Sequence, residues 1–221
     1  MTHIIILSIV AYNYGMRMSH IKKIEYIKKS DPILAAAIDG IKLRALPKRE
    51  DHFRSLVGAI VNQQLSGRAA DTILERFVAL FPRKEFPSPK DVEKMPVAKM
   101  RKAGLSKMKV NFLKDLAKKV LDGTVNLKEI GLWSDEEVIE HLTRVKGIGP
   151  WTAEMFLMFS LGREDVFSYG DLGLKNAIKK IYKFKKHPTI AQAKKITDRW
   201  RPYRSLGSRY LWATLDKSTP K

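Results

Sequence analysis

The segment Val145-Lys-Gly-Ile-Gly-Pro-Trp-Thr-Ala153 connects two helical patterns and decides the fold. Upstream of it, Ser134-Asp-Glu-Glu137 is a capping box, which predicts a helix that runs to about Arg144. Downstream, residues 151–161 are apolar on nearly every face, which predicts a helix buried between other elements. Two glycines allow close approach of the backbone, and the N–H groups that begin the second helix can bind a phosphate. The segment therefore predicts a tight hairpin of two helices over residues 136–161.

Helical periodicity continues on both sides of this hairpin. Apolar residues recur every three or four positions over residues 51–63 and 69–80, before Pro82, Pro87 and Pro89 predict an irregular break. Asp31-Pro32 is a start signal for a further helix. The other expected helices cover residues 33–38, 113–121, 172–183, 189–200 and 203–215. Because no alternating strand pattern occurs after residue 20, the predicted fold class is all-α.

Composition limits the classes of protein that this chain can belong to. Its 221 residues, 44% of them hydrophobic, suffice for one compact domain or two small lobes with a sizeable core. Cysteine is absent, which excludes disulfides, thiolate zinc sites and cysteine-bound iron–sulfur clusters. We therefore expect no cofactor and no metal centre of these kinds.

The chain is strongly basic, and its positive charge is unevenly distributed along the sequence. Lys and Arg number 42 against 23 Asp and Glu, for a net charge of +19. Residues 99–119 hold 8 Lys or Arg and one acid, and residues 175–204 hold 11 and one. Solvated helix faces would explain a single such run, but two runs favour a surface that follows a nucleic-acid backbone. An anionic membrane surface is the weaker alternative, because no strongly amphipathic terminal helix accompanies the basic runs.

The N-terminal segment carries no convincing targeting signal. Residues 4–12 are apolar but fall short of the about 20 residues that span a bilayer, and no basic start or cleavage site flanks them. Met16 and Met18 precede ordinary polar sequence, so we interpret residues 1–18 as an N-terminal extension and expect natural translation to start at these methionines and to omit residues 1–15. For a prokaryotic source, we expect a cytoplasmic, nucleoid-associated protein.

The hairpin segment, followed by Asp165-Val-Phe-Ser-Tyr-Gly-Asp171, resembles the helix-hairpin-helix DNA glycosylase superfamily. Arg201-Pro-Tyr-Arg-Ser205 and Tyr210-Leu-Trp-Ala213 are similar to the C-terminal signature of its alkylation-repair branch, the 3-methyladenine DNA glycosylase II type. The resemblance spans roughly residues 30–216. It implies two helical lobes, residues 19–50 with 165–221 and residues 51–164, and an active-site cleft between them.

The resemblance assigns Asp171 as the catalytic residue. A carboxylate can stabilise the oxocarbenium-like sugar that forms when an N-glycosidic bond breaks, and it can orient water. The alternative reading is that Asp171 only caps the helix that follows it.

The same resemblance implies a set of DNA contacts. The hairpin would grip the phosphate backbone through Lys146, Gly147, Ile148, Gly149 and Thr152. An enzyme that acts on a base must extrude its nucleotide from the duplex. Gln64 is the candidate plug for the vacated space, with Leu65 as the adjacent wedge. A polar residue at a helix end and a core leucine are the alternative readings of these two positions.

The base pocket is expected to contain aromatic side chains. Trp151 and Trp212 match pocket tryptophans of the alkylation-repair relatives, and Met155 stands where a bacterial relative has tyrosine. A tryptophan face attracts the positive charge of an N-methylated purine by about 0.5–2 kcal/mol. Both tryptophans could instead belong to the core between the lobes.

These features predict a monofunctional DNA glycosylase that hydrolyses alkylated purines of the 3-methyladenine and 7-methylguanine type and leaves an abasic site. Trp151 occupies the position after the hairpin where bifunctional members carry a nucleophilic lysine, so water is the expected nucleophile. We expect a monomer that binds double-stranded DNA with a damaged base. The alternatives are a glycosylase for deaminated, oxidised or mismatched bases and a non-catalytic DNA-binding module.

Overall fold

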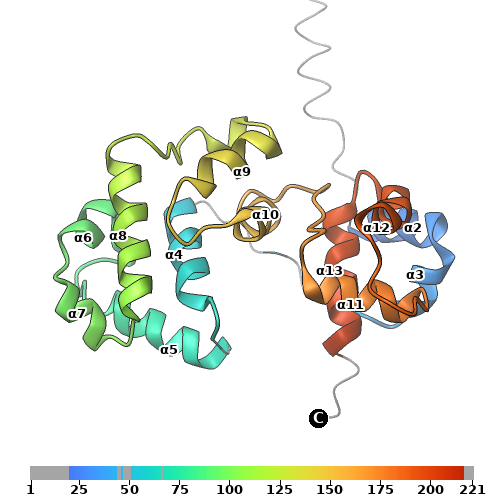
Figure 1. Cartoon of the computed structure of the whole chain (residues 1–221), viewed down its shortest axis with the longest axis horizontal. Coiled ribbons are helices and arrows are strands. Elements are labelled where there is room, and N and C mark those ends of the chain that lie inside the picture. The colour runs from blue at the N-terminus through green and yellow to red at the C-terminus, as the bar shows by residue number, and fades with distance from the viewer. Residues whose placement is uncertain (1–19, 44–45, 47–50, 66, 217–221) are drawn as a thin grey trace, which may run out of the picture. The chain divides into compact units, whose positions relative to one another are not determined.

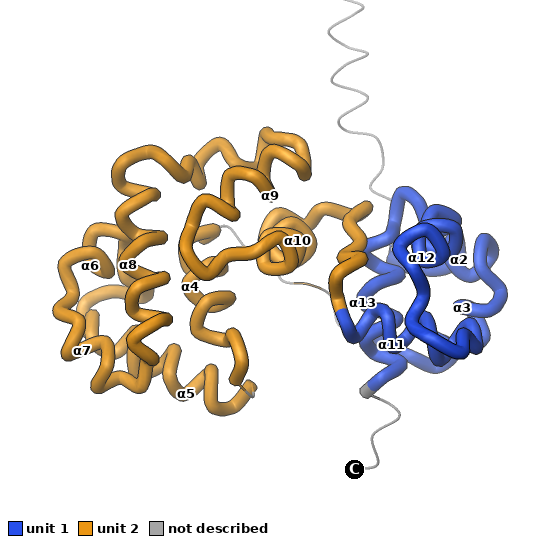
Figure 2. Tube along the Cα trace, viewed as in Figure 1, with its two compact units in different colours: residues 1–43, 172–221 blue, residues 44–171 orange. Residues whose placement is uncertain are grey.

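The computed structural model describes residues 20–43, 46, 51–65 and 67–216. Within these residues every regular element is a helix, which confirms the all-α prediction (Figure 1). The chain divides into two compact units, residues 1–43 with 172–221 and residues 44–171 (Figure 2). The sequence placed these boundaries after residues 50 and 164. In the observed division, Asp171 belongs to the same unit as the hairpin.

The unit of residues 44–171 is built around helix α4 (His52–Asn62). This helix contacts α5 (Gly67–Val78), α8 (Lys107–Leu121) and α10 (Pro150–Phe159). Its apolar stripe, Leu56, Val57 and Ile60, is fully buried, as is the facing stripe of α8. Burial of about 25 cal/mol per Å² of apolar surface drives this packing. The remaining helices of the unit are α6 (Pro89–Lys94), α7 (Val97–Lys102), η1 (Ile130–Leu132) and α9 (Asp135–Thr143).

Two local expectations for this unit are wrong. Pro89 does not break the chain but begins α6, because Ser88 caps the helix and forms a reciprocal capping box with Asp91. Helix α8 starts at Lys107 rather than near residue 113, because the Ser106 side chain accepts a hydrogen bond from the Lys109 N–H. Proline at the first helical position lacks only an N–H that the helix would leave unpaired.

The second unit joins the two ends of the described chain. It contains α2 (His20–Ser30), α3 (Pro32–Ala37), α11 (Leu172–Ile181), α12 (Ile190–Thr197), η2 (Asp198–Trp200) and α13 (Arg204–Asp216). Asp31 is fully buried and accepts hydrogen bonds from the Leu34 N–H at 3.0 Å, the Tyr182 hydroxyl at 2.6 Å and the Trp200 indole at 3.0 Å. One carboxylate thus both caps α3 and ties it to segments about 150 residues away.

The extension proposed for residues 1–18 lies outside the described residues. Among the residues that are described, no helix has both the length and the apolar character needed to cross a bilayer.

Candidate active site

The hairpin between α9 and α10 has a backbone shape that requires glycine. Gly147 adopts φ = +83°, a left-handed conformation that other residues rarely take. A Cβ atom at this position would lie 2.2 Å from the Phe112 ring of α8. Gly149 is the N-cap residue of α10 and has no side chain that could accept a hydrogen bond from the first N–H groups of the helix. Pro150 follows at the first helical position. The first N–H groups of α10 therefore have no intrahelical partner and suit an anion.

Two hydrogen bonds fix this hairpin to neighbouring helices. Asp115 of α8 accepts one from the Lys146 N–H at 2.8 Å and another from the Lys119 ammonium at 2.7 Å. Burial alone would raise the pKa of Asp115, but these donors hold it below its usual value. From the other side, the Gln63 side-chain amide donates to the Gly147 carbonyl at 2.7 Å. The hairpin is thus held between α8 and the end of α4.

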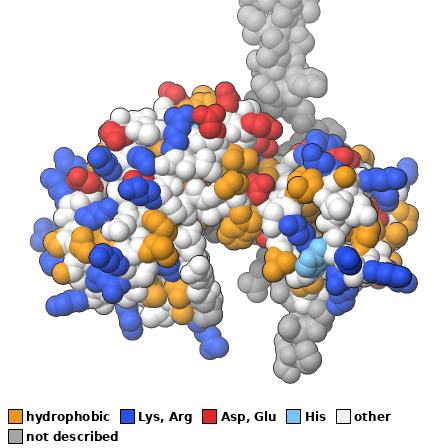
Figure 3. All heavy atoms as spheres, viewed as in Figure 1, with side chains coloured by type: hydrophobic (Ala, Val, Ile, Leu, Met, Phe, Trp, Pro, Cys, Tyr) orange, Lys and Arg blue, Asp and Glu red, His pale blue; other side chains and the backbone are white. Residues whose placement is uncertain are grey.

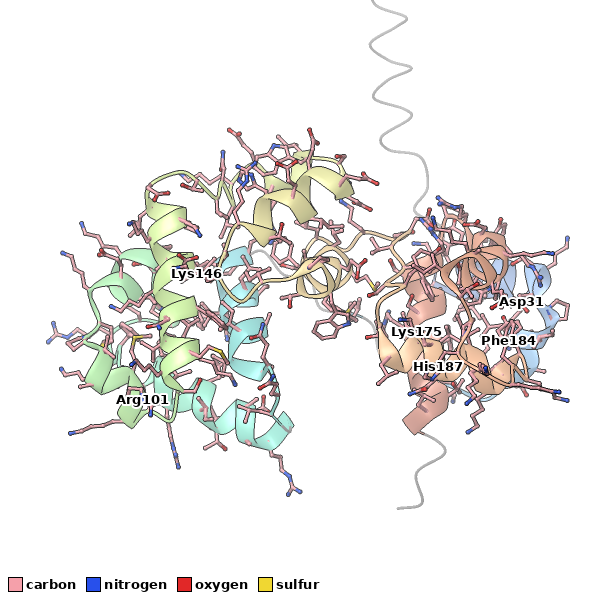
Figure 4. All side chains as sticks on the ribbon, viewed as in Figure 1. Asp31, Arg101, Lys146, Lys175, Phe184 and His187 are labelled. Carbon is pink, nitrogen blue, oxygen red and sulfur yellow. The ribbon has the colours of Figure 1, made fainter. Side chains whose placement is uncertain are left out.

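The side chains predicted to contact DNA through the hairpin differ in exposure. Ile148 and Thr152 are 4% and 6% exposed, so their side chains face the interior and only their backbone groups can reach a phosphate. Lys146 is exposed and lies beside α8 (Figure 4). The hairpin therefore offers backbone N–H groups together with one flexible ammonium.

Asp171 and Trp151 meet in the structure. The Trp151 indole N–H donates to the Asp171 carboxylate at 2.7 Å. Asp171 is 8% exposed, and its own N–H donates to the Ser168 carbonyl at 3.2 Å. Trp151 is 48% exposed, so the expectation that this helix is buried on all faces is wrong at Trp151. The tryptophan ring is thus presented outward while its N–H orients a nearly buried carboxylate.

Glu154, which the sequence analysis missed, is a second acid beside Asp171. Its carboxylate accepts a hydrogen bond from the Ser168 hydroxyl. Burial raises the pKa of Glu154 above its usual value, and the charge of Asp171 raises it further, against the opposing effect of Ser168. Trp151 and Glu154 are three residues apart on α10 and therefore share a face. That spacing is the signal from which Glu154 could have been found.

The other predicted pocket residues lie on two helices. Met155 is half-buried and follows Trp151 by one turn of α10, so the two share a face. Trp212 is also half-buried but lies on α13 of the other unit. Its assignment to the base pocket stays a prediction.

The loop after α4 presents Gln64 and Leu65 at the surface. Gln64 is exposed and adopts φ = +56°, a strained conformation for a residue other than glycine. Leu65 is 38% exposed, which disfavours the reading of this residue as part of the core. Just before the loop, Lys109 donates to the Val61 carbonyl at 2.7 Å, and burial lowers the pKa of this lysine. These contacts hold the loop at the end of α4, next to the hairpin.

This fold and hairpin define a class of DNA repair proteins. The family model described as "HhH-GPD superfamily base excision DNA repair protein" matches residues 57–202. The chain belongs to this superfamily.

Individual relatives within the superfamily have names that state a particular activity. The chain is 37% identical over 172 residues to DNA-3-methyladenine glycosylase 1 of Schizosaccharomyces pombe, which covers 77% of this chain and 75% of that protein. The solved structure of the 3-methyladenine DNA glycosylase from this yeast, in complex with abasic DNA, is 31% identical, with a TM-score of 0.79 over 90% of this chain and 100% of that one. A DNA-3-methyladenine glycosidase from Bacillus halodurans is 34% identical, with a TM-score of 0.77 over 89% of this chain and 91% of that one.

Proposed function

We propose that this protein is a monofunctional DNA glycosylase that hydrolyses the N-glycosidic bond of alkylated purines in double-stranded DNA. The hydrogen bond from Trp151 to Asp171 is the observation that carries the proposal. It places an oriented carboxylate beside an exposed aromatic face at the start of α10. Backbone binding alone needs neither group. The names of the relatives, DNA-3-methyladenine glycosylases, support the same activity.

Asp171 would act on the sugar of an extruded nucleotide. As the glycosidic bond breaks, positive charge develops on the sugar, and a nearly buried carboxylate stabilises that charge more strongly than it would in water. The same carboxylate can orient the attacking water. A purine alkylated at N3 or N7 carries a positive charge and leaves as a neutral base, so its departure needs no proton from the protein.

Trp151 and Met155 would form one wall of the base pocket. A cationic purine stacked on the indole gains about 0.5–2 kcal/mol that a neutral base does not. Met155 supplies a polarizable surface with several rotamers, which favours a range of alkylated bases over one shape. We include Trp212 as a further pocket residue on the basis of the sequence resemblance.

The lesion is best identified with a panel of duplex oligonucleotides, each carrying one damaged base, followed by alkaline cleavage at abasic sites. We expect excision of 3-methyladenine and 7-methylguanine and little excision of deaminated or oxidised bases. Asp171→Asn should reduce excision by orders of magnitude while DNA affinity stays the same or rises. Efficient excision of uracil or 8-oxoguanine alone would contradict the alkylpurine proposal, and normal turnover by the Asp171→Asn variant would contradict the mechanism.

Hydrolysis rather than strand cleavage follows from the residue after the hairpin. Trp151 has no nucleophilic amine, and Lys146 precedes the glycines and lies against α8. Borohydride added during turnover should therefore trap no protein–DNA adduct above background. A trapped adduct that disappears on replacing one lysine would make the enzyme a lyase.

We further propose that the protein acts as a monomer and that, for a prokaryotic source, it acts on the DNA of the nucleoid. The hairpin, Trp151 and Asp171 all come from one unit of one chain, which supports activity without a second copy. Sedimentation of the protein with and without a lesion duplex should give one chain per DNA.

A further inference from the structure

The basic run of residues 99–119 covers the end of α7 and most of α8, and the lysines on α8 fall into two groups. Three lysines of this helix donate to protein groups. Lys109 binds the Val61 carbonyl, Lys114 binds the carbonyls of Glu93 and Met95, and Lys119 binds Asp115 and the Arg144 carbonyl. These ammonium groups hold α8 against the ends of α4, α6 and α9. The high charge of the run is therefore partly structural.

Lys107 and Lys118 form a second group, which lines a surface groove. They are eleven residues apart, which is three helical turns, so both lie on one face of α8 with Asn111 between them. These three residues line a groove of about 670 Å³ together with Phe112 and Lys146. Phe112 is also the ring that packs against Gly147, so the groove begins at the hairpin itself. Figure 3 shows Lys and Arg side chains spread over one face of this unit, with more of the acidic side chains toward α9 than elsewhere.

One acid, Asp115, also lines this groove, and Asp122 lies just beyond it; both are already engaged. Asp115 accepts hydrogen bonds from Lys119 and from the Lys146 N–H. Asp122, one turn beyond Lys118, accepts a hydrogen bond from the Thr124 N–H at 2.9 Å. Lys107 and Lys118 are both exposed. The groove therefore keeps a positive potential suited to a chain of phosphates.

We propose that this groove, lined by Lys107, Asn111, Lys118 and Lys146, is a second phosphate track that holds the DNA backbone beyond the lesion. The inference rests on the proposed function, because the hairpin sets where the DNA enters the groove. Lys107 and Lys118 are about 16 Å apart along α8 at 1.5 Å per residue. One strand of B-DNA carries about five phosphates over that length. Asn111 can donate to the same backbone.

The test compares two double variants of the full chain. Lys107→Met/Lys118→Met removes the groove charges while keeping the length of the side chains. Lys90→Met/Lys94→Met removes the same charge from α6, where both lysines are exposed and outside the groove. The probe is a duplex of about 25 base pairs with a central abasic analogue, which fixes the register. Two further duplexes are shortened to about four base pairs on one side or the other.

The groove variant should bind the long duplex about 10-fold more weakly than wild type, and its salt slope should fall by about 1.8, or 0.9 for each lost phosphate contact. For one of the two shortened duplexes, the groove variant and wild type should bind with equal affinity, because the flank that occupies the groove is missing. The α6 variant should bind each of the three duplexes with an affinity less than 2-fold below that of wild type. Equal losses for the two variants on the long duplex, or the same loss on every duplex, would overturn the proposal. Binding does not depend on chemistry, so a groove effect without excision would refute the proposed function alone.

Discussion

At the scale of single residues, the Trp151 side chain has two separable parts. The ring offers a face to a base, and the N–H orients Asp171. Trp151→Phe keeps an aromatic face and removes the donor. A hydrogen bond to a charged group contributes about 1.5–3 kcal/mol, so we expect the single-turnover excision rate to fall about 10-fold or more. Affinity for an abasic duplex should change less than 2-fold.

Trp133→Phe is the matched control for this experiment, because the Trp133 ring stacks edge-on against His141 and gives no hydrogen bond to Asp171. An excision rate for Trp151→Phe equal to that of the control would mean that the indole N–H does not position the carboxylate.

Glu154 leads to a prediction about pH and stability. Its pKa is raised in the folded protein, first by burial and then by Asp171. Ionising Glu154 therefore costs folding free energy, and this cost is absent below its unfolded pKa of 4.5 and grows as pH rises toward the folded value. Glu154→Gln keeps an acceptor for Ser168 without the charge. We expect the Tm of this variant to rise relative to wild type between pH 4 and the neutral range, as measured by calorimetry at several pH values. A difference that does not vary with pH would contradict this expectation.

At the scale of elements, the loop after α4 and the hairpin are joined by Gln63. The strained backbone of Gln64 directly follows this bond to the Gly147 carbonyl, so the bond should help to keep the loop ready for insertion into DNA. Gln63→Met retains the length of the side chain but not the donor. Losing about 0.5–1.5 kcal/mol predicts a fall of 2- to 10-fold in base extrusion, measured by 2-aminopurine fluorescence beside the lesion.

The neighbouring Asn62 provides the control for this element. Its side chain binds the Gly58 carbonyl of its own helix at 2.9 Å, so Asn62→Leu loses a hydrogen bond but not the link to the hairpin. Equal extrusion by the two variants would show that the Gln63 link has no role in positioning the loop.

The elements also show how far sequence reasoning reaches. The hairpin could be predicted because its determinants, the Ser134 capping box and the glycine pair, are local. Helix α6 was missed although its signal is also local: Ser88 and Asp91 have the spacing of a capping box, and Pro89 occupies the first helical position, where proline starts a helix rather than breaking it.

The candidate site also has a part that the sequence predicted and a part that only the structure shows. Asp171 and Trp151 followed from a motif resemblance, which named the two residues without their hydrogen bond. The contact of Glu154 with Ser168 joins residues fourteen positions apart and depends on how the chain turns after α10. No local pattern reports such a contact. The basic run of residues 99–119 could be counted in the sequence, but only the structure separates its structural lysines from those of the groove.

At the scale of the whole molecule, the Asp31 network holds α3, near the start of the described chain, to Tyr182 after α11 and to Trp200 in η2. Burial first, and then Asp31, raises the pKa of Tyr182, so its hydroxyl stays protonated and donates to the carboxylate. Tyr182→Phe leaves Asp31 with one donor fewer in a buried place. We expect the free energy of unfolding to fall by about 1.5–3 kcal/mol, as measured by denaturant titration.

Tyr26→Phe removes a hydroxyl from the same unit, where the Tyr26 ring is 42% exposed and packs edge-on against Tyr203. It should change the stability by no more than about 0.5 kcal/mol. If Tyr26→Phe lowered the stability as much as Tyr182→Phe, the hydrogen bond from Tyr182 to Asp31 would contribute no more to stability than an exposed hydroxyl does.

The wide separation of the Asp31 partners also has a consequence for synthesis on the ribosome. Tyr182 follows Asp31 by 151 residues, and Trp200 follows it by 169. At about 5–20 residues per second, the ribosome makes Tyr182 roughly 8–30 seconds after Asp31. During that interval α3 lacks the partners that bury its capping residue, and every residue of the 44–171 unit is made before the interval ends. The unit that carries the hairpin and Asp171 can thus begin to fold first, while the cap of α3 waits for Tyr182 and Trp200.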